Sequence, residues 1–290
     1  MPSLAILIET AESEGAHELH TKMATLIRTR LAQIKETPTV DTLENGISLL
    51  KQVQELAGKA PSASVAALCS QLSLLITRSI AHSHPEGVAL VPASASQTEP
   101  PAAKKKKANK GQAVPACAPA AAVKSSPVVQ VYAASMTDFM TRKKSKIQTS
   151  LFLDLCNRHP ALGLQLLPDI SDLIANGSVE KGFKVVQGFN IMAACLQKLP
   201  VKENAINLPS LKRFHESFIA ALLESTTPNQ EKGMTAARVK ELMKPSIAIA
   251  KRLKKALENE GLFAETKKTL EGRDLEDEVK TALKGLLTVL

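Results

Sequence analysis

The stretch SVEKGFKVVQGFNIMAACLQKLP, residues 178–200, decides the fold class. Its large apolar side chains recur at steps of three and four residues, which is the period of an α-helix. Apolar residues also occupy most of the other faces of this helix, so several neighbouring elements must cover it. The stretch therefore predicts a core helix inside a stack of helices. The residues in register are Val186, Phe189, Met192, Ala193, Leu196 and Leu199.

The rest of the chain repeats this pattern. Of its 290 residues, 44% are hydrophobic but only 3% are aromatic, with no Trp and one Tyr. The apolar positions hold mainly Leu, Ile, Ala and Met, most of which favour helix, whereas sheets favour β-branched and aromatic residues. Helical periodicity appears over residues 14–35, 42–58 and 61–81, with Asp41 or Thr42 as a helix cap, and again from residue 127 to the end. We therefore predict an all-α fold, an armadillo/HEAT-like helical array without a fixed repeat consensus.

A segment without helical periodicity divides this array. From residue 84 to about residue 130 the chain is mainly Pro, Ala, Ser and Lys, which cannot bury enough apolar surface to offset the entropy of ordering. We therefore predict an N-terminal helical bundle over residues 1–83, a disordered basic linker over 84–130 and a C-terminal helical-repeat domain over 131–290. Within this last domain, Pro245 is expected in the first turn of a separate helix. The apolar pattern still runs at Leu290, so the array is expected to continue.

The cysteines and apolar runs suggest a soluble intracellular protein. The cysteines form no CxxC pair, and buried reduced thiols are expected. The N-terminus has no basic region before its apolar run, as a signal peptide would, and the apolar runs look too short to span a bilayer. We therefore expect no membrane partner. The four cysteines are Cys69, Cys117, Cys156 and Cys195.

No enzyme motif or metal site is expected. Gly177 and Gly182 have the spacing of a phosphate loop, but Phe183 stands where that loop needs Lys, so a helix end followed by a helix start is favoured. His215 is expected on a polar helix face. Two histidine pairs lack the further ligands that a metal ion needs, namely His17 with His20 and His82 with His84. The sequence therefore predicts no enzymatic activity, no cofactor and no metal.

The basic residues carry the main chemical signal. The net charge is +9, and the linker contributes six Lys against two Glu. Its run KKKKANK can lie in the acidic groove of a nuclear import receptor, lie along phosphates, or serve as a solvated tether. The import signal is favoured, and the other two interpretations stay open. The residues concerned are Lys104, Lys105, Lys106, Lys107 and Lys110.

Two further basic clusters are candidate contacts for nucleic acid or an acidic partner. TRKKSK lies at a break between two helices, and KRLKKALE lies on a helix face, where Lys254 can pair with Glu258. Aromatic residues that stack on single strands are not interleaved in KRLKKALE. A solvated surface is favoured for both clusters, and nucleic-acid binding stays open. The candidate residues are Arg142, Lys143, Lys144 and Lys146 in the first cluster and Lys251, Arg252, Lys254 and Lys255 in the second.

Residues 131–170, VYAASMTDFMTRKKSKIQTSLFLDLCNRHPALGLQLLPDI, resemble the C-terminal region of the Myb-binding protein 1A family, also called DNA polymerase V/phi. The resemblance rests on the FMTRKKS junction before an apolar helix and on RHP before a Leu-rich helix. The stretch MTAARVKELMKPSIAIAKRLKK, residues 234–255, and the Lys-rich linker fit the same region. The resemblance covers most of the chain, and its motifs are helical rather than catalytic.

This resemblance implies a nuclear, mainly nucleolar protein with an armadillo-like helical array. Family members bind transcription factors, act as co-repressors, and influence ribosomal RNA gene transcription and ribosome production. We therefore expect a non-enzymatic transcription co-regulator and scaffold, whose partners are transcription factors, other nuclear proteins and an import receptor. The alternative is a nucleolar protein that binds DNA or RNA directly through its basic helix faces. Full-length members also carry a large N-terminal array and a long basic tail, which this sequence does not contain.

The import interpretation predicts that the lysine run directs localisation. Replacing Lys104 to Lys107 with Ala in a fluorescent fusion should abolish accumulation in the nucleus and nucleolus, because the receptor groove would lose its cationic ligand. Imaging of living cells measures the nuclear-to-cytoplasmic ratio. Unchanged nucleolar accumulation of this variant would remove the import assignment.

Overall fold

A computed structural model describes residues 22, 25–27, 29, 37–88, 125–179, 181–197, 208–226, 234–257, 263–273 and 277–290. The predicted helix over 14–35 lies mostly outside these residues. The secondary-structure elements of the described part are all helical, so the predicted all-α helical array is confirmed. They are α3 (Leu43–Gly58), α4 (Ala63–Ser83), the short 3₁₀ helix η2 (Pro85–Gly87), α5 (Pro127–Thr141), α6 (Thr149–Arg158), α7 (Pro160–Ala175), α8 (Gly182–Gln197), α9 (Leu208–Thr226), α10 (Ala236–Leu257), α11 (Ala264–Glu271) and α12 (Asp277–Val289).

Hydroxyl side chains begin three of these helices. The Thr42 hydroxyl accepts a hydrogen bond from the Asn45 N–H at the start of α3, so of the two predicted caps, Asp41 or Thr42, the helix uses Thr42. Ser62 does the same for α4 and Ser126 for α5, where Pro127 follows as the first helical residue. Each cap satisfies an N–H group that has no partner within its own helix.

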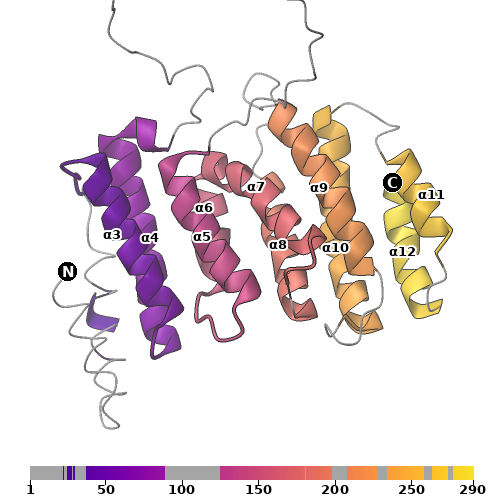
Figure 1. The fold of residues 1–290 in the computed structure, drawn as a ribbon, viewed down its shortest axis with the longest axis horizontal. Helices are drawn as coiled ribbons and strands as arrows, with labels where there is room; N and C mark the ends of the chain where they lie inside the picture. The colour runs from indigo at the N-terminus through magenta and orange to yellow at the C-terminus, as the bar shows by residue number, and fades with distance from the viewer. Residues whose placement is uncertain are drawn as a thin grey trace, which may run out of the picture.

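The helices stand side by side in two layers (Figure 1). One layer contains α3, α5, α7 and α9, and the other contains α4, α6, α8, α10 and α12. Successive helices run in opposite directions, so the α3–α4, α5–α6, α7–α8 and α9–α10 connections lie at one end of the array, the lower end in Figure 1. The long helix α8 packs against α6, α7 and α10, which explains why the stretch 178–200 is apolar on most faces.

The helices before the linker continue the array that follows it. Helix α3 packs against α5, and α4 packs against α6. The contact is partly polar: the Thr77 hydroxyl on α4 lies 2.9 Å from the Tyr132 hydroxyl on α5, and Ser135 on α5 donates to the side-chain oxygen of Gln54 on α3. The backbone N–H of Lys146 also donates to the Gly58 carbonyl at 3.2 Å. The predicted N-terminal bundle is therefore not separate in space from the C-terminal repeats.

The limits of the predicted linker are narrower in the structure. Its first residues form η2, and its last four form the first turn of α5. Residues 89–124 lie outside the described part of the chain. Both ends of that gap, Val88 and Ser125, lie at the end of the array opposite the α5–α6 connection.

Pro245 does not begin a separate helix. Helix α10 runs without interruption from Ala236 to Leu257, and Pro245 is buried in its middle. A proline inside a helix removes one backbone hydrogen bond, at a cost of about 3 kcal/mol. Here the buried ring adds to the apolar face of α10, which offsets part of that cost. Pro168 also lies inside a helix, α7, where it is half-buried.

Two of the predicted reduced thiols are paired. Cys156 on α6 and Cys195 on α8 form a disulfide with a Cα–Cα distance of 4.9 Å, and both are fully buried. Cys69 is a buried free thiol, and burial raises its pKa to about 11. Cys117 lies outside the described residues. The predicted burial is therefore correct for these three cysteines, and the predicted reduced state is wrong for Cys156 and Cys195, because their helices are adjacent although 39 residues separate them.

Helix α4 is long and apolar enough to cross a bilayer by length and composition, although the apolar runs of the sequence look too short for that. Its most apolar window of 18 residues has a mean hydropathy of 1.4. In the structure, 67% of this window is buried inside the protein, where α4 packs on α3 and α6. This burial is what a core helix of a helical array requires.

Glycine allows a close approach of helices around the Cys156–Cys195 pair. A Cβ atom at Gly163 of α7 would lie 3.0 Å from the Cys156 sulfur, 3.1 Å from the Cys195 sulfur and 3.3 Å from the Cys156 Cα. Because a backbone atom and two linked sulfurs surround it, none of these neighbours can move aside easily. Gly163 therefore fixes how closely α7 packs on α6 and α8.

Gly163→Ala should destabilise the protein by about 1–3 kcal/mol, because the new methyl group overpacks this contact. The matched control is Gly285→Ala on the exposed face of α12, where the nearest atom is 3.5 Å away. That change should stabilise the protein by up to about 1 kcal/mol, the helix-propensity difference. Chemical denaturation followed by circular dichroism measures both values. Equal effects of the two substitutions would contradict the packing described for α7.

Candidate functional site: a groove between α3 and α5 and a basic end of the array

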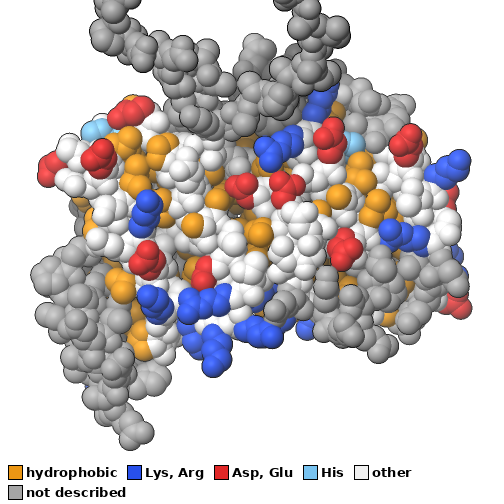
Figure 2. Space-filling view, in the orientation of Figure 1, with side chains coloured by type: hydrophobic (Ala, Val, Ile, Leu, Met, Phe, Trp, Pro, Cys, Tyr) orange, Lys and Arg blue, Asp and Glu red, His pale blue; other side chains and the backbone are white. Residues whose placement is uncertain are grey.

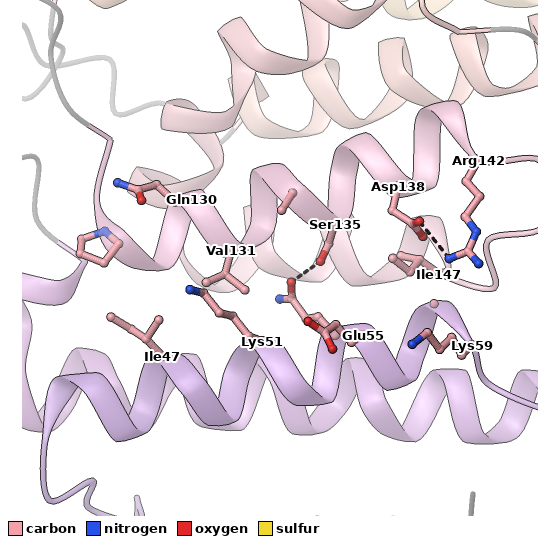
Figure 3. A pocket seen from close by; sticks show the side chains of 14 residues that line it. Ile47, Lys51, Glu55, Lys59, Gln130, Val131, Ser135, Asp138, Arg142 and Ile147 are labelled. Atoms are coloured by element: carbon pink, nitrogen blue, oxygen red, sulfur yellow. Dashed lines mark hydrogen bonds and ion pairs between the residues drawn. The ribbon is translucent and has the colours of Figure 1, made fainter.

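A groove of about 640 Å³ lies between α3 and α5 (Figure 3). Small residues create the space, because Gly58, Ala134 and Ser135 stand where the two helices face each other. Apolar side chains of both helices line it together with charged ones. This volume falls in the range of sites that hold a small ligand or a few side chains of a partner. The other lining residues are Ile47, Lys51, Gln54, Glu55, Lys59, Pro127, Gln130, Val131, Asp138, Arg142 and Ile147.

Gln54 is the chemically most informative residue of the groove. Its side chain is only 2% exposed, and its oxygen accepts a hydrogen bond from the Ser135 hydroxyl. Its amide nitrogen, Nε2, is buried as well. Burial raises the pKa of the neighbouring Tyr132 hydroxyl, whereas hydrogen bonds with Thr77 and Gln54 act to lower it. Gln54 is therefore the buried polar residue that joins α3 to α5 through Ser135 and Tyr132.

The charges of the groove are partly paired. Asp138 accepts a hydrogen bond from Ser145 at 2.6 Å and forms an ion pair with Arg142 at 3.4 Å, marked in Figure 3. Lys51 and Glu55 on α3 and Lys59 directly after it are exposed and follow one another at four-residue steps. The floor of the groove is therefore apolar apart from the buried Gln54 and Ser135, and its rim is charged.

The first predicted basic cluster lies next to this groove. Arg142, Lys143, Lys144 and Lys146 are all exposed at the α5–α6 connection. The backbone bond between Lys146 and Gly58 brings them beside Lys59, the residue that ends α3. Figure 2 shows Lys and Arg side chains gathering at this lower edge of the molecule. We call Lys59, Arg142, Lys143, Lys144, Lys146 and Lys181 the basic end.

A buried lysine joins the basic end to α8. Lys184, near the start of α8, is 8% exposed, and its ammonium group donates to the carbonyls of Phe139 and Arg142, the latter at 2.7 Å. The ammonium also lies 5.5 Å from the centre of the Phe139 ring. Its positive charge satisfies carbonyls at the end of α5. Lys184 therefore holds the α5–α6 connection against α8.

The second predicted basic cluster lies at the opposite end of the array. Arg252 donates to the Gln197 carbonyl at the end of α8 at 3.4 Å, and Lys254 donates to the Leu290 carbonyl after α12 at 3.2 Å. Lys251 and Lys255 are exposed. The full length of α8, about 24 Å for its 16 residues, separates the two clusters. They cannot form one surface, and half of the second cluster serves helix packing.

The lysine run of the linker lies outside the described residues. It consists of Lys104, Lys105, Lys106, Lys107 and Lys110. The described chain leaves at Val88 and returns at Ser125, both at the end of the array away from the basic end.

The motifs that resemble enzyme sites have packing roles. Gly177, with a φ angle of 65°, ends α7: its N–H bonds to the Ile174 carbonyl, and the Ser178 N–H bonds to that of Leu173. This is a helix end followed by the start of α8, as the sequence analysis favours. No group of three or more His, Cys, Asp or Glu that could hold a metal ion occurs within the described part of the chain.

The histidines also have packing positions. His84 bridges Glu86 and the Val40 carbonyl, at 3.2 and 3.1 Å. His215 does not lie on a polar face as predicted. It packs edge-on against the Phe263 ring at 4.9 Å, and burial lowers its pKa. Burial also lowers the pKa of His159.

Several residues of this region carry no signal in the sequence. Gln54 and Lys59 precede the linker, whereas their neighbours Ser135 and Lys146 follow it, and no local pattern indicates that α3 lies beside α5. In the sequence, Phe183 stands out only because it occupies the position where a phosphate loop needs Lys. In the structure it is 47% exposed beside the basic end.

Comparison with known proteins identifies a family. A family model described as Myb-binding protein 1A-like, TPR repeats, matches residues 2–288. No curated protein and no solved structure matches the chain. TPR repeats are helix pairs of about 34 residues. Helices α5 and α7 begin at Pro127 and Pro160, 33 residues apart, and α6 and α8 begin at Thr149 and Gly182, also 33 apart.

Proposed function

Because the chain belongs to the Myb-binding protein 1A-like family of TPR-repeat proteins, we propose that it is a non-enzymatic scaffold that binds other proteins through the groove between α3 and α5. A helical-repeat array stacks its units into an extended surface, and such surfaces are used for binding.

The observation that carries this proposal is the groove itself, a space of about 640 Å³ that is lined by apolar side chains and bordered by charged ones. An amphipathic helix binds a groove of this kind by laying its apolar face into it. Ile47, Val131 and Ile147 supply the apolar contacts for such a segment. Lys51, Glu55 and Lys59, exposed at the border, supply charges that can pair with its polar face.

We further propose that these partners are transcription factors and other nuclear proteins, and that the protein acts as a co-repressor in the nucleus and nucleolus. In this role it would influence ribosomal RNA gene transcription and ribosome biogenesis. The family resemblance over residues 131–170 and the linker lysines, read as a ligand of an import receptor, support this part of the proposal.

Ala134→Trp should block the groove, because Ala134 is an exposed residue on its wall and an indole would fill the space beside Gln54. Affinity purification from nuclear extract treated with nuclease, followed by quantitative mass spectrometry, measures binding. Recovery of groove-dependent proteins should fall by about tenfold or more, equivalent to about 1.4 kcal/mol of lost binding free energy.

The matched control is Ala264→Trp, at an exposed position on α11 far along the array. This variant should recover the same proteins as the unmodified chain, and both variants should keep the unmodified melting temperature. Full recovery by Ala134→Trp would remove the groove from the proposal. If the unmodified chain recovers proteins from untreated extract but none from nuclease-treated extract, nucleic acid bridges them to the chain.

A further inference from the structure

We propose that the basic end binds single-stranded nucleic acid, with its lysines along the phosphates and Phe183 stacked on a base. This surface adjoins the α3–α5 groove, which would bind proteins, and shares Lys59 and Arg142 with its border. Phe183 lies outside the groove and Ala134 outside the basic end, so substitutions at these two residues test the two proposals separately. It uses one of the two basic clusters noted in the sequence and adds residues from α3, α8 and α10.

The basic end is one continuous surface formed by three parts of the chain. Lys59 follows α3, the cluster from Arg142 to Lys146 follows α5, and Lys181 precedes α8. Backbone bonds connect them: Lys146 N–H to the Gly58 carbonyl at 3.2 Å, and Lys184 N–H to the Lys181 carbonyl at 2.8 Å. The ammonium of Lys184 then bonds to the Arg142 carbonyl. The lysines therefore lie close together although more than 120 residues separate the first from the last.

Most of these charges have no acidic partner. Arg142 pairs with Asp138, but Lys59, Lys144, Lys146 and Lys181 have no ion-pair partner among the residues that the structure describes. Cations held together in this way repel one another and attract a polyanion. Helices α6, α8 and α10 also begin at this end, and the positive ends of their dipoles add to the attraction for phosphate.

Phe183 provides what a merely charged surface lacks. It stands in the first turn of α8 with 47% of its surface exposed, and Leu26 is the other large hydrophobic residue exposed in the described part of the chain. The guanidinium carbon of Arg238, on α10, lies 5.7 Å from the centre of the Phe183 ring. An exposed aromatic ring beside Arg and Lys is the arrangement on which unpaired bases stack in single-strand binding proteins.

The position of Phe183 relative to the lysines is fixed. The next residue, Lys184, is buried and bonded to the carbonyls of Phe139 and Arg142. The aromatic ring and the α5–α6 connection are thus held together before any ligand arrives, so binding need not order them.

The stacking residue decides between ligand classes. An acidic protein segment would match the lysines but would leave Phe183 without a planar partner. A duplex would match the lysines too, but its bases are already stacked on one another, whereas unpaired bases are available. Single-stranded RNA or DNA satisfies both features at once.

The test uses the full chain with Lys104–107 and Lys110 changed to Ala, so that linker lysines do not contribute. The probe is a fluorescein-labelled uridine 20-mer, and fluorescence anisotropy measures its binding at several salt concentrations. Affinity should fall steeply with salt, with a logarithmic slope of about −0.7 for each phosphate neutralised. Four contacts would give a slope of about −3.

Two variants separate charge from stacking. Lys59→Ala with Lys144→Ala and Lys146→Ala should weaken binding by at least about tenfold and make the slope shallower by about 2. Phe183→Leu should weaken binding by roughly five- to hundredfold without changing the slope, because it removes stacking and keeps the charge. Phe183→Trp should restore binding. The control, Lys251→Ala with Lys255→Ala at the opposite end, should bind as the parent does.

Three outcomes would overturn the proposal. One is absence of binding at low salt. Another is an unchanged affinity of the Phe183→Leu variant, which would mean that the surface binds by charge alone and without stacking. The third is equal binding of the duplex form of the probe, or equal competition by polyglutamate, which would assign the surface to duplex nucleic acid or to acidic proteins. None of these results bears on the Ala134→Trp experiment, so failure here is distinguishable from failure of the scaffold proposal.

Discussion

The structure depends on helices covering one another's apolar faces in two layers. The described elements include no sheet, so each helix finds its apolar partner on the helices beside it and in the facing layer. Helix α8 shows the constraint most clearly, since eleven of its residues from Gly182 to Leu196 are buried. The burial of the Phe189, Phe214, Phe218 and Phe263 rings continues the same core from α8 through α9 to α11.

This constraint also creates the two candidate surfaces. Helix α3 must cover α5, but small residues stand at Gly58, Ala134 and Ser135, so the contact leaves a groove. Alternating helix directions bring the α3–α4 and α5–α6 connections and the start of α8 to the same end of the array. Lysines at these places therefore gather into the basic end without being close in sequence, and Lys184 holds two of the elements in contact.

Local features could be read from the sequence, and contacts between distant segments could not. The helical periods, the Thr42 cap and the burial of Val186, Phe189 and Met192 depend on neighbouring residues, and they are correct. The interpretation of Pro245 was wrong because tertiary packing keeps a proline inside a helix. The Cys156–Cys195 pair and the groove both require knowledge of which helices are adjacent. The same holds for Phe183, whose exposure beside Arg238 and the lysines results from the way α8 and α10 pack.

The central claim is that the helices before and after the linker form one packed array. It is tested most directly by inserting a site-specific protease sequence after Gly111 and cutting the purified protein there. Burial of residues such as Leu50, Leu68 and Tyr132 between the two parts should hold the fragments together. Size-exclusion chromatography should then show one species with the volume of the uncut protein, which unfolds in a single transition. Two separate fragments that each elute alone without denaturant would contradict the account.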